Sequence, residues 1–370
     1  MKIIIILPTY NEKTNIERMI PMLEKEVIPT VRDHTLEILV ADDKSPDGTA
    51  DVVRSFMKKH KNITLLEGEK KGLGAAYAKA MTYAMEKMGA GAVIEFDSDF
   101  QHDPHDIPRL IAAMDRGYDY VIGSRYIPGG KIPKEWGLHR KMMSFFGSLF
   151  ARVVLLCPQI HDMTSGFKLT KTDYLKKVDL DHLYSKYYAY KIQILYEIVK
   201  LKAKVTEVPI VFYERTEGSS KIERRDLFDS FFVVMKLRIR DSARFIKFLV
   251  TGGTGFSTQI IIQEGSIYIG LAAIMATLLL PLEASILGVS DINGLAHTMG
   301  AALGAEAAIL SNFLINNFWT FDDTRKLKEK SPFIIRLLKF NGFSLLSISL
   351  QTLAVYLGER FIGPEMNLAD

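Results

Sequence analysis

The sequence predicts an α/β domain with a mainly parallel sheet, followed by an all-helical domain in a membrane. Up to about residue 240, charges are dense and short apolar runs alternate with segments of helical periodicity. That order is the one that crossover units of a parallel sheet require. From Phe245 onward, long apolar stretches appear, interrupted mostly by Gly, Ser, Thr and Asn. Stretches of this length are typical of membrane helices.

Five apolar runs are expected to form the strands, with helices between them. They are "KIIIILP" (2–8), "LEILVA" (36–41), "NITLLE" (62–67), "AVIEFD" (92–97) and "YVIGS" (120–124). Their apolar character is nearly continuous, which is typical of parallel strands that are covered by helices on both faces.

Polar loops follow three of these strands. "PTYNE" (8–12) follows the first, "DDKSPDGT" (42–49) the second, and "DSDFQ" (97–101) the fourth. Each loop alone is explained equally well as helix capping or turn chemistry. Because ligands of a parallel sheet bind at the carboxyl ends of its strands, three such loops together predict a ligand-binding crevice.

The loop after the fourth strand has the composition of a cation site. Asp97 and Asp99 alternate at a strand end, and Gln101 adds an amide oxygen. Oxygen donors of this kind, completed by substrate phosphates, suit Mg²⁺ or Mn²⁺. Such a cation would neutralise a departing diphosphate. A helix-capping role for the two aspartates near Pro104 is compatible with this interpretation.

Three further features bear on function. "KKGLGAAYAKA" (70–80) is a Gly-rich turn that opens a helix, and such a turn either cradles a phosphate or simply enters the helix tightly. The net charge of +4 comes without an aromatic-interleaved basic stripe, so we expect no nucleic-acid partner. The single cysteine, Cys157, excludes an intramolecular disulfide and fits a reducing compartment.

Eight motifs occur in order over roughly residues 1–235. They are "PTYNE", "DDKSPDGT", "KKGLGAAY", "DSDFQHDP", "GSRYIPGG", "HRKMMS", "TSGFKL" and "ERTEGSSK". In this order the chain resembles an inverting family-2 glycosyltransferase with a GT-A fold, which is a Rossmann-like arrangement. More narrowly, it resembles dolichol-phosphate mannose synthases and related polyprenyl-phosphate glycosyltransferases.

The resemblance implies a role for individual residues on the donor side. The nucleoside would be held by Pro8, Tyr10 and Glu12, and Asp43 would read the base. Metal and diphosphate would be bound by Asp97, Ser98, Asp99 and Gln101, with Asp97, Asp99 and Gln101 as the metal ligands. Arg215 and Lys221 would bind phosphate groups from a late loop, although a surface salt bridge is the alternative for both.

On the acceptor side, the resemblance implies that Arg125, Arg140 and Ser144 hold the phosphate of a lipid. The planar fork of arginine pairs well with phosphate oxygens. Asp99, Arg125 and Arg215 would be the catalytic residues. A phosphate monoester has a second pKa of roughly 6 and is already largely dianionic near neutrality, so no general base is expected.

Three segments are long and apolar enough to cross a bilayer, at about 245–271, 295–321 and 333–357. Lys- and Arg-rich stretches lie before the first segment and between the second and third segments. Such basic stretches remain on the cytoplasmic side of a membrane, so both are expected there. "RFIKFLVTGGTG" and "NFLINNFWTF" resemble the GtrA-type membrane domain, which usually has four helices. We therefore expect either a three-helix variant or an incomplete sequence.

The expected domain boundaries follow from these segments. Residues 1–220 would form the catalytic domain, 221–244 juxtamembrane amphipathic helices, and 245–370 the membrane domain. Residues 137–157 mix aromatic and aliphatic side chains with Arg and Lys. This segment is predicted either as an interfacial helix near the acceptor or as a helix that packs on the soluble domain.

The expected activity is metal-dependent transfer of mannose from GDP-mannose to dolichyl phosphate, with inversion, at the cytoplasmic face of the membrane. The alternative is transfer of glucose or a similar sugar from a UDP-sugar to undecaprenyl phosphate. A processive polysaccharide synthase is disfavoured because the sequence lacks Gln-x-x-Arg-Trp. A lipid flippase or scaffold with an inactive transferase half is disfavoured because "DSDFQ", Arg125 and Arg140 are intact.

Overall fold

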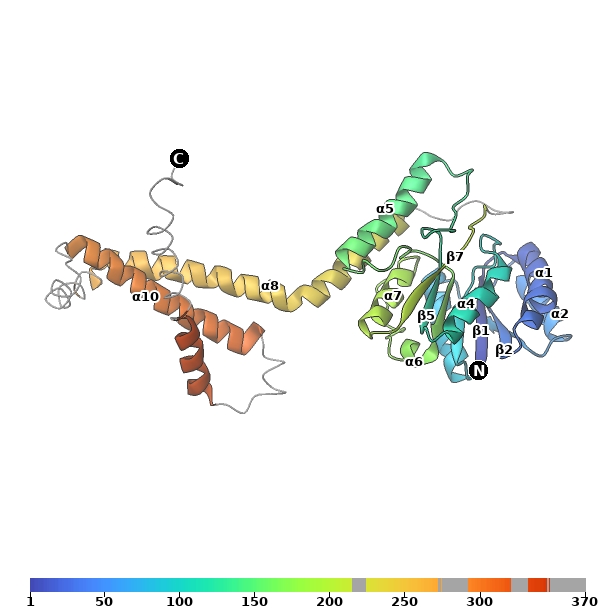
Figure 1. Ribbon diagram of the computed structural model, residues 1–370, viewed down its shortest axis with the longest axis horizontal. Helices are drawn as coiled ribbons and strands as arrows, with labels where there is room; N and C mark the ends of the chain where they lie inside the picture. Colours follow the sequence, from blue (N-terminus) through green and yellow to red (C-terminus); the bar gives the residue numbers. More distant parts are fainter. Residues whose placement is uncertain (215–223, 272–273, 275–291, 321–331, 345, 347–370) are drawn as a thin grey trace. The chain divides into compact units, whose positions relative to one another are not determined.

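The computed structural model describes the chain apart from residues 215–223, 272–273, 275–291, 321–331, 345 and 347–370 (Figure 1). The chain divides into two compact units, Met1–Arg240 and Asp241–Asp370. The first unit contains the whole sheet. The second unit is helical in the part that is described.

The first unit alternates strands and helices. Its strands are β1 (Lys2–Thr9), β2 (Thr35–Asp42), β3 (Ile63–Glu67), β4 (Ala92–Glu95), β5 (Tyr120–Ser124), β6 (Lys168–Lys171) and β7 (Val205–Pro209). Its α-helices are α1 (Lys13–Met22), α2 (Thr49–Met57), α3 (Leu73–Glu86), α4 (Ile107–Asp115), α5 (Leu138–Val154), α6 (Thr172–Leu175), α7 (Tyr190–Lys200) and the start of α8 (Arg224–Tyr268). Short π or 3₁₀ turns occupy η1 (Leu23–Val27), η2 (Ile28–Thr30) and η3 (Pro104–Asp106).

The seven strands form one sheet in the order β3-β2-β1-β4-β6-β5-β7. All neighbouring pairs are parallel except those made by β6, which runs antiparallel to both β4 and β5. The predicted mainly parallel α/β fold is therefore confirmed. The five predicted strands are all present, and β6 and β7 are additions that the apolar pattern did not show.

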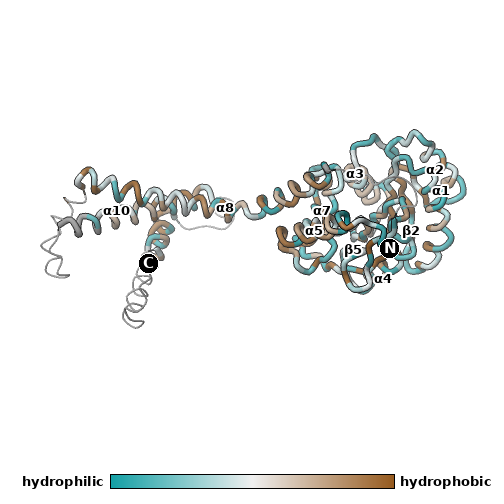
Figure 2. Tube along the Cα trace, turned by 90° about the horizontal axis from the view of Figure 1, so that it is seen from above, coloured by the Kyte–Doolittle hydropathy of each residue, from teal (hydrophilic) through white to brown (hydrophobic). Residues whose placement is uncertain are grey.

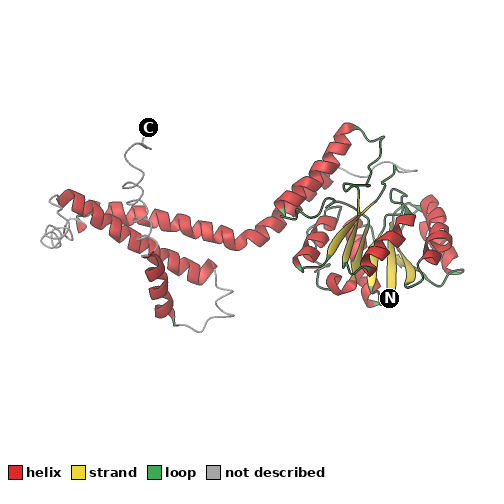
Figure 3. Ribbon diagram, in the orientation of Figure 1, coloured by secondary structure: helices red, strands yellow, loops and turns green. Residues whose placement is uncertain are grey.

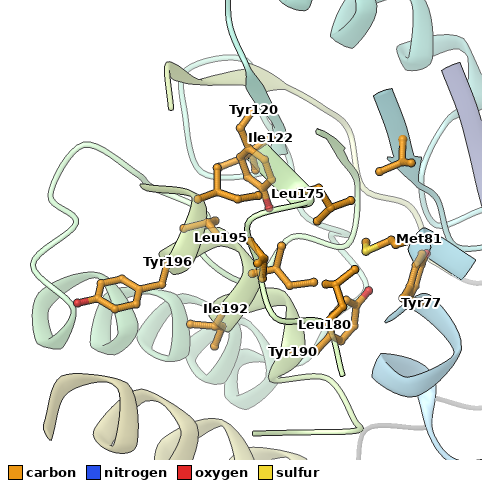
Figure 4. Packing of buried hydrophobic residues seen from close by; sticks show 14 of the residues in the cluster. Tyr77, Met81, Tyr120, Ile122, Leu175, Leu180, Tyr190, Ile192, Leu195 and Tyr196 are labelled. Atoms are coloured by element: carbon orange, nitrogen blue, oxygen red, sulfur yellow. The ribbon is translucent and has the colours of Figure 1, made fainter. Parts of the chain in front are cut away.

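Helices cover both faces of the sheet (Figure 3). Successive residues of a strand point to opposite faces, so in β1 the side chains of Ile4 and Ile6 enter one core and those of Ile3 and Ile5 the other. The first core includes residues of α3, α5, α7 and α8, and Figure 4 shows part of it around Tyr77, Tyr120 and Tyr190. The second core is formed with α1, α2 and α4.

The helix α8 begins in the first unit and continues without interruption into the second. Among the described residues, it contains the one helical stretch, Arg225–Tyr268, that is long and apolar enough to cross a membrane. Hydrophobic positions recur along it in Figure 2. The predicted first membrane segment lies largely within α8, whereas the predicted segment at 333–357 falls partly outside the described residues.

In the second unit, α8 contacts α10 (Ile292–Ile315), which is followed by the π-helical turn η4 (Asn316–Thr320). Small residues allow this contact. A Cβ atom added at Gly304 would lie 2.6 Å from the backbone oxygen of Gln259, and one added at Gly300 would lie 3.0 Å from the side chain of Ile267. Close approach of backbones at glycine is typical of helix pairs in membranes.

Candidate active site

The loops after β1, β2 and β4 meet at one edge of the sheet, as the strand order requires. The hydroxyl of Thr9 donates to Asp42 Oδ1 at 2.9 Å, and the hydroxyl of Ser45 donates to the same oxygen at 2.6 Å. The hydroxyl of Ser98 donates to the carbonyl oxygen of Pro8 at 3.2 Å. Asp42 is fully buried, so it holds the first two loops together and does not face a ligand.

Each of these three loops contains a residue other than glycine in the left-handed region of backbone space. The φ angles are 57° at Asn11, 53° at Lys44 and 59° at Phe100. This conformation costs of the order of 1–3 kcal/mol for an L-residue and tends to occur at functional sites. Three of the five described residues of this kind thus lie where the sequence predicts ligand binding, and the other two are Leu156 and Lys202.

A cavity of about 190 Å³, the smaller cavity, opens between these loops. Seven of the residues predicted for the donor side line it: Pro8, Tyr10, Glu12, Asp43, Asp97, Ser98 and Asp99. Lys70 also lines it, with its Nζ atom 3.5 Å from the centre of the Tyr10 ring. The cavity thus combines an aromatic ring, carboxylates and a cation, which are the groups that bind a base, a ribose and phosphates.

Asp43, which lines this cavity, has a raised pKa. Burial and the neighbouring carboxylate of Asp42 raise the pKa of Asp43 to about 6. Lys79 and Lys70 act in the opposite direction without cancelling the effect. Asp43 therefore changes charge close to physiological pH.

Asp97 lies where the smaller cavity adjoins a second one, and it lines both. Its Oδ1 accepts a hydrogen bond of 2.8 Å from the hydroxyl of Tyr77, and its Oδ2 lies 3.3 Å from the Nζ atom of Lys191. Burial alone would raise the pKa of Asp97, but Lys191 and the Tyr77 hydroxyl outweigh burial and hold the pKa below its usual range. Asp97 is thus a carboxylate at neutral pH.

The residues predicted to bind a metal are of the right type for a hard cation. Asp99 is 6% exposed and Gln101 is 7% exposed, and Asp99 Oδ1 accepts a hydrogen bond from the backbone N–H of Gln101 at 3.1 Å. The amide nitrogen of Gln101 donates to the carbonyl oxygen of Tyr213 at 3.4 Å. Two carboxylates and an amide oxygen within one five-residue loop match the donors that Mg²⁺ and Mn²⁺ prefer.

The second cavity, the larger cavity, has a volume of about 700 Å³. Asp97, Gln101 and three residues predicted for the acceptor side, Arg125, Arg140 and Ser144, line its polar part. Apolar side chains line another part of it: Met143, Phe150, Ile192, Leu227, Phe231 and Val234. They come from α5, α7 and the first turns of α8, all within the first unit.

Arg125 at the end of β5 is held by a buried carboxylate. Its Nε and Nη2 atoms each donate to Asp162 at 2.7 Å, and Nη2 also donates to the Thr164 hydroxyl at 2.9 Å. Asp162 is fully buried. Burial would raise the pKa of Asp162, but the guanidinium of Arg125 outweighs it and holds the pKa below its usual range. The pair fixes the guanidinium at the wall of the larger cavity.

The other two acceptor-side residues, Arg140 and Ser144, lie on α5. The guanidinium carbon of Arg140 lies 4.1 Å from the centre of the Trp136 ring, and the Ser144 hydroxyl accepts a 2.6 Å hydrogen bond from Tyr126. On α5, Phe145 and Phe146 are 47% and 52% exposed. This helix therefore presents apolar side chains outward as well as polar ones to the cavity.

His102 is structural at this site. It is 2% exposed and lies among the rings of Phe96, Phe167 and Phe212. Burial lowers the pKa of His102 to about 3. The imidazole is therefore neutral at physiological pH and carries no charge into the larger cavity.

The structure brings together eleven of the thirteen predicted site residues around these two adjoining cavities. The other two, Arg215 and Lys221, lie outside the described residues. The sequence interpretation did not single out Lys191, Tyr77 or Asp162. Tyr77 lies within the Gly-rich motif at 70–80, and Lys191 follows a Tyr-rich stretch around residue 188. Asp162 has no local signal and is 37 residues away from Arg125 in the chain.

Comparison with known proteins agrees with this geometry. Residues 4–179 match the glycosyl transferase family 2 model, and residues 247–369 match the GtrA/DPMS transmembrane domain. Fold, site and matches together define a glycosyltransferase joined to a transmembrane domain. The predicted resemblance is confirmed.

Among related proteins, undecaprenyl-phosphate mannosyltransferase of Micrococcus luteus is 36% identical over 223 residues, which cover 60% of this chain and 88% of that protein. Dolichol-phosphate mannosyltransferase of Pyrococcus furiosus is 30% identical over 376 residues, which cover 100% of this chain and 94% of that protein. The chain belongs to glycosyl transferase family 2.

Among solved structures, glucosyl-3-phosphoglycerate synthase from Mycobacterium tuberculosis, in complex with Mn²⁺, uridine diphosphate and glucosyl-3-phosphoglycerate, is 19% identical. The similarity covers 64% of this chain and 79% of that one, with a TM-score of 0.43.

Proposed function

We propose that the protein transfers mannose from GDP-mannose to dolichyl phosphate or another polyprenyl phosphate, with inversion at the anomeric carbon. The observation that carries the proposal is the pair of cavities that share Asp97 as a wall. The smaller cavity is lined by carboxylates, an aromatic ring and a lysine, and the larger one is partly lined by apolar side chains. Two relatives whose names describe mannosyltransferases of lipid phosphates align with 60% and 100% of this chain, respectively.

The smaller cavity suits the nucleotide part of the donor. Tyr10 offers a ring against which a base can stack, Asp43 offers carboxylate oxygens to the N–H groups of guanine, and Lys70 offers a positive charge to the phosphates. Guanine presents two adjacent N–H donors on one edge, so a carboxylate is the side chain that matches it. This pairing favours GDP over UDP as the nucleotide.

The larger cavity suits a lipid phosphate. Its guanidinium groups, Arg125 and Arg140, match phosphate oxygens, and its apolar part matches a hydrocarbon chain. An oxygen of the phosphate monoester forms the new bond to the anomeric carbon while the bond from that carbon to the diphosphate breaks, and GDP leaves. The attacking oxygen carries no proton at neutral pH, so the site works by positioning and charge neutralisation.

Asp97, Asp99 and Gln101 would hold a divalent cation, Mg²⁺ or Mn²⁺, next to the diphosphate. When bound, such a cation supplies positive charge that stabilises the leaving group. The donor types support this assignment, as do the positions of Asp97 and Asp99 in the smaller cavity and of Gln101 in the adjoining larger one. In this scheme neither aspartate acts as an acid or a base.

The catalytic unit would face the cytoplasm. The segment "KLRIRDSARFIK" (236–247) before the first apolar stretch and the segment at 322–339 are both rich in Lys and Arg. Basic residues flanking membrane helices remain on the cytoplasmic side. Nucleotide sugars made in the cytoplasm would then reach the smaller cavity directly.

The test is sugar transfer by the purified full chain in lipid vesicles with Mg²⁺ or Mn²⁺. Dolichyl phosphate and undecaprenyl phosphate would be offered separately, each with a panel of labelled nucleotide sugars. We expect labelled mannosyl lipid from GDP-mannose with at least one acceptor. Transfer from UDP-glucose but not from GDP-mannose would overturn the proposed donor.

A further inference from the structure

Lys191 contacts the carboxylate that the two cavities share, and the predicted roles do not include it. It lies in the first turn of α7, and its side chain is 5% exposed. Its ammonium nitrogen lies 3.3 Å from Asp97 Oδ2, whereas the Tyr77 hydroxyl binds Oδ1 of the same carboxylate. Asp97 is therefore held at one oxygen by the ammonium group of Lys191 and at the other by the neutral hydroxyl of Tyr77.

The surroundings of Lys191 fix its ammonium group in this position. Its own carbonyl oxygen accepts a 2.9 Å hydrogen bond from the Nζ atom of Lys168, which is fully buried. Opposite the ammonium stands Gly166, where an added Cβ would overlap Lys191 Nζ and come within 2.9 Å of Asp97 Oδ2. Only the smallest residue leaves room for this ion pair.

The charge of Lys191 bears directly on cation binding at Asp97. A partly buried carboxylate is costly unless a positive charge neutralises it, and Lys191 supplies that charge in the protein without ligands. A divalent cation that approaches Asp97 meets the same ammonium group. Two positive charges near one carboxylate oxygen repel each other strongly at the effective permittivity of protein sites.

We propose that Lys191 is a positioning residue of the transferase site, which holds Asp97 in place and supplies the charge that neutralises it when no divalent cation is bound. The inference deepens the proposed function and rests on its cation site. It has two consequences of opposite sign. Removing the ammonium group strengthens cation binding because the repulsion disappears, and it slows transfer because Asp97 loses one of its two restraints.

The test measures cation binding apart from turnover. Full-length Lys191→Met protein in detergent would be titrated with Mn²⁺ alone, and free Mn²⁺ would be followed by electron paramagnetic resonance. We expect binding roughly tenfold tighter than in the wild type, an order of magnitude set by Coulomb's law. At saturating Mn²⁺, we expect kcat for mannose transfer to fall roughly tenfold, the loss of about one hydrogen bond to a charged group.

Tyr77→Phe is the matched control, since it removes the other hydrogen bond to Asp97 and no charge. We expect it to lower kcat with Mn²⁺ affinity unchanged. Lys191→Gln is the second variant, because it removes the charge and keeps a neutral hydrogen-bond donor on the side chain, and we expect tighter Mn²⁺ binding here too. A purely structural role of Lys191 would lower kcat without strengthening Mn²⁺ binding.

Unchanged or weaker Mn²⁺ binding in Lys191→Met and Lys191→Gln would overturn the inference, and so would a failure of the wild type to bind Mn²⁺. The outcome is separable from that of the proposed function. Mn²⁺ binding is measured without sugar or lipid, so a wild-type protein that binds Mn²⁺ and transfers no mannose would overturn only the function.

Discussion

Lowering the pH from 7 to 5 should weaken binding of the nucleotide sugar through one side chain, Asp43. Burial and the nearby Asp42 raise the pKa of Asp43 to about 6. The ionised carboxylate accepts hydrogen bonds from guanine N–H groups, and the protonated form loses that capacity in part. Donor affinity should therefore fall as the pH drops through about 6.

The magnitude follows from this pKa. With a pKa of about 6, roughly nine-tenths of Asp43 is ionised at pH 7 and roughly one-tenth at pH 5. The apparent KM for GDP-mannose should rise roughly tenfold over these two pH units. The same rise in pH that strengthens donor binding lowers the free energy of unfolding. The folded state holds the proton more tightly than the unfolded state, so Asp43 destabilises the fold as the pH rises from about 4 to about 6.

The assay is the initial rate of mannose transfer at several donor concentrations and at pH values from 5 to 7, with saturating lipid acceptor. Asp43→Asn should have a raised KM for the donor at pH 7 that no longer changes with pH. The same variant should melt at a higher temperature than the wild type at pH 7. A donor KM that is flat between pH 5 and 7, or an identical pH profile in Asp43→Asn, would refute the role of Asp43.

Two further predictions concern other carboxylates. Asp99→Asn should abolish cation-dependent transfer while the circular dichroism spectrum and melting temperature stay near those of the wild type, and unchanged turnover would disprove the cation role. Asp162→Asn should leave the Arg125 guanidinium buried without a counter-charge. It should lower the free energy of unfolding by about 3–5 kcal/mol in urea titrations of the full chain, and a loss below about 1 kcal/mol would show that the pair contributes little.

The sequence was sufficient to predict the architecture of the first unit because five of its strands are continuous apolar runs. It missed β6 because that strand has four residues and contains two lysines, one of them fully buried. A buried lysine is rare and contradicts the apolar pattern on which strand prediction depends. The reversed direction of β6 also follows from tertiary pairing with β4 and β5, which no local pattern encodes.

The site was predicted where function follows from position in the fold. Tyr10, Asp43 and Asp99 come directly after strands, and the carboxyl ends of parallel strands meet at one edge. The groups that hold the site in place were not predicted. Asp162 lies 37 positions from Arg125 in the chain, and Lys191 lies 94 positions from Asp97. Each pair therefore meets only in the folded protein. Contacts between residues so far apart in the chain leave no periodic pattern in the sequence.

The left-handed backbone at Asn11, Lys44 and Phe100 limits how this enzyme can be engineered. Replacing Lys44 by glycine would relieve a backbone cost of roughly 1–2 kcal/mol, although glycine also gains entropy in the unfolded chain. Phe100 packs against the second core, and Asn adopts this backbone conformation more readily than other residues, so glycine gains less at those two positions. A selection for heat resistance alone would therefore tend to accept glycine at Lys44. The same loops position the ligand-binding side chains, so such variants would gain thermal tolerance and lose turnover. A selection should therefore test heat resistance and activity together.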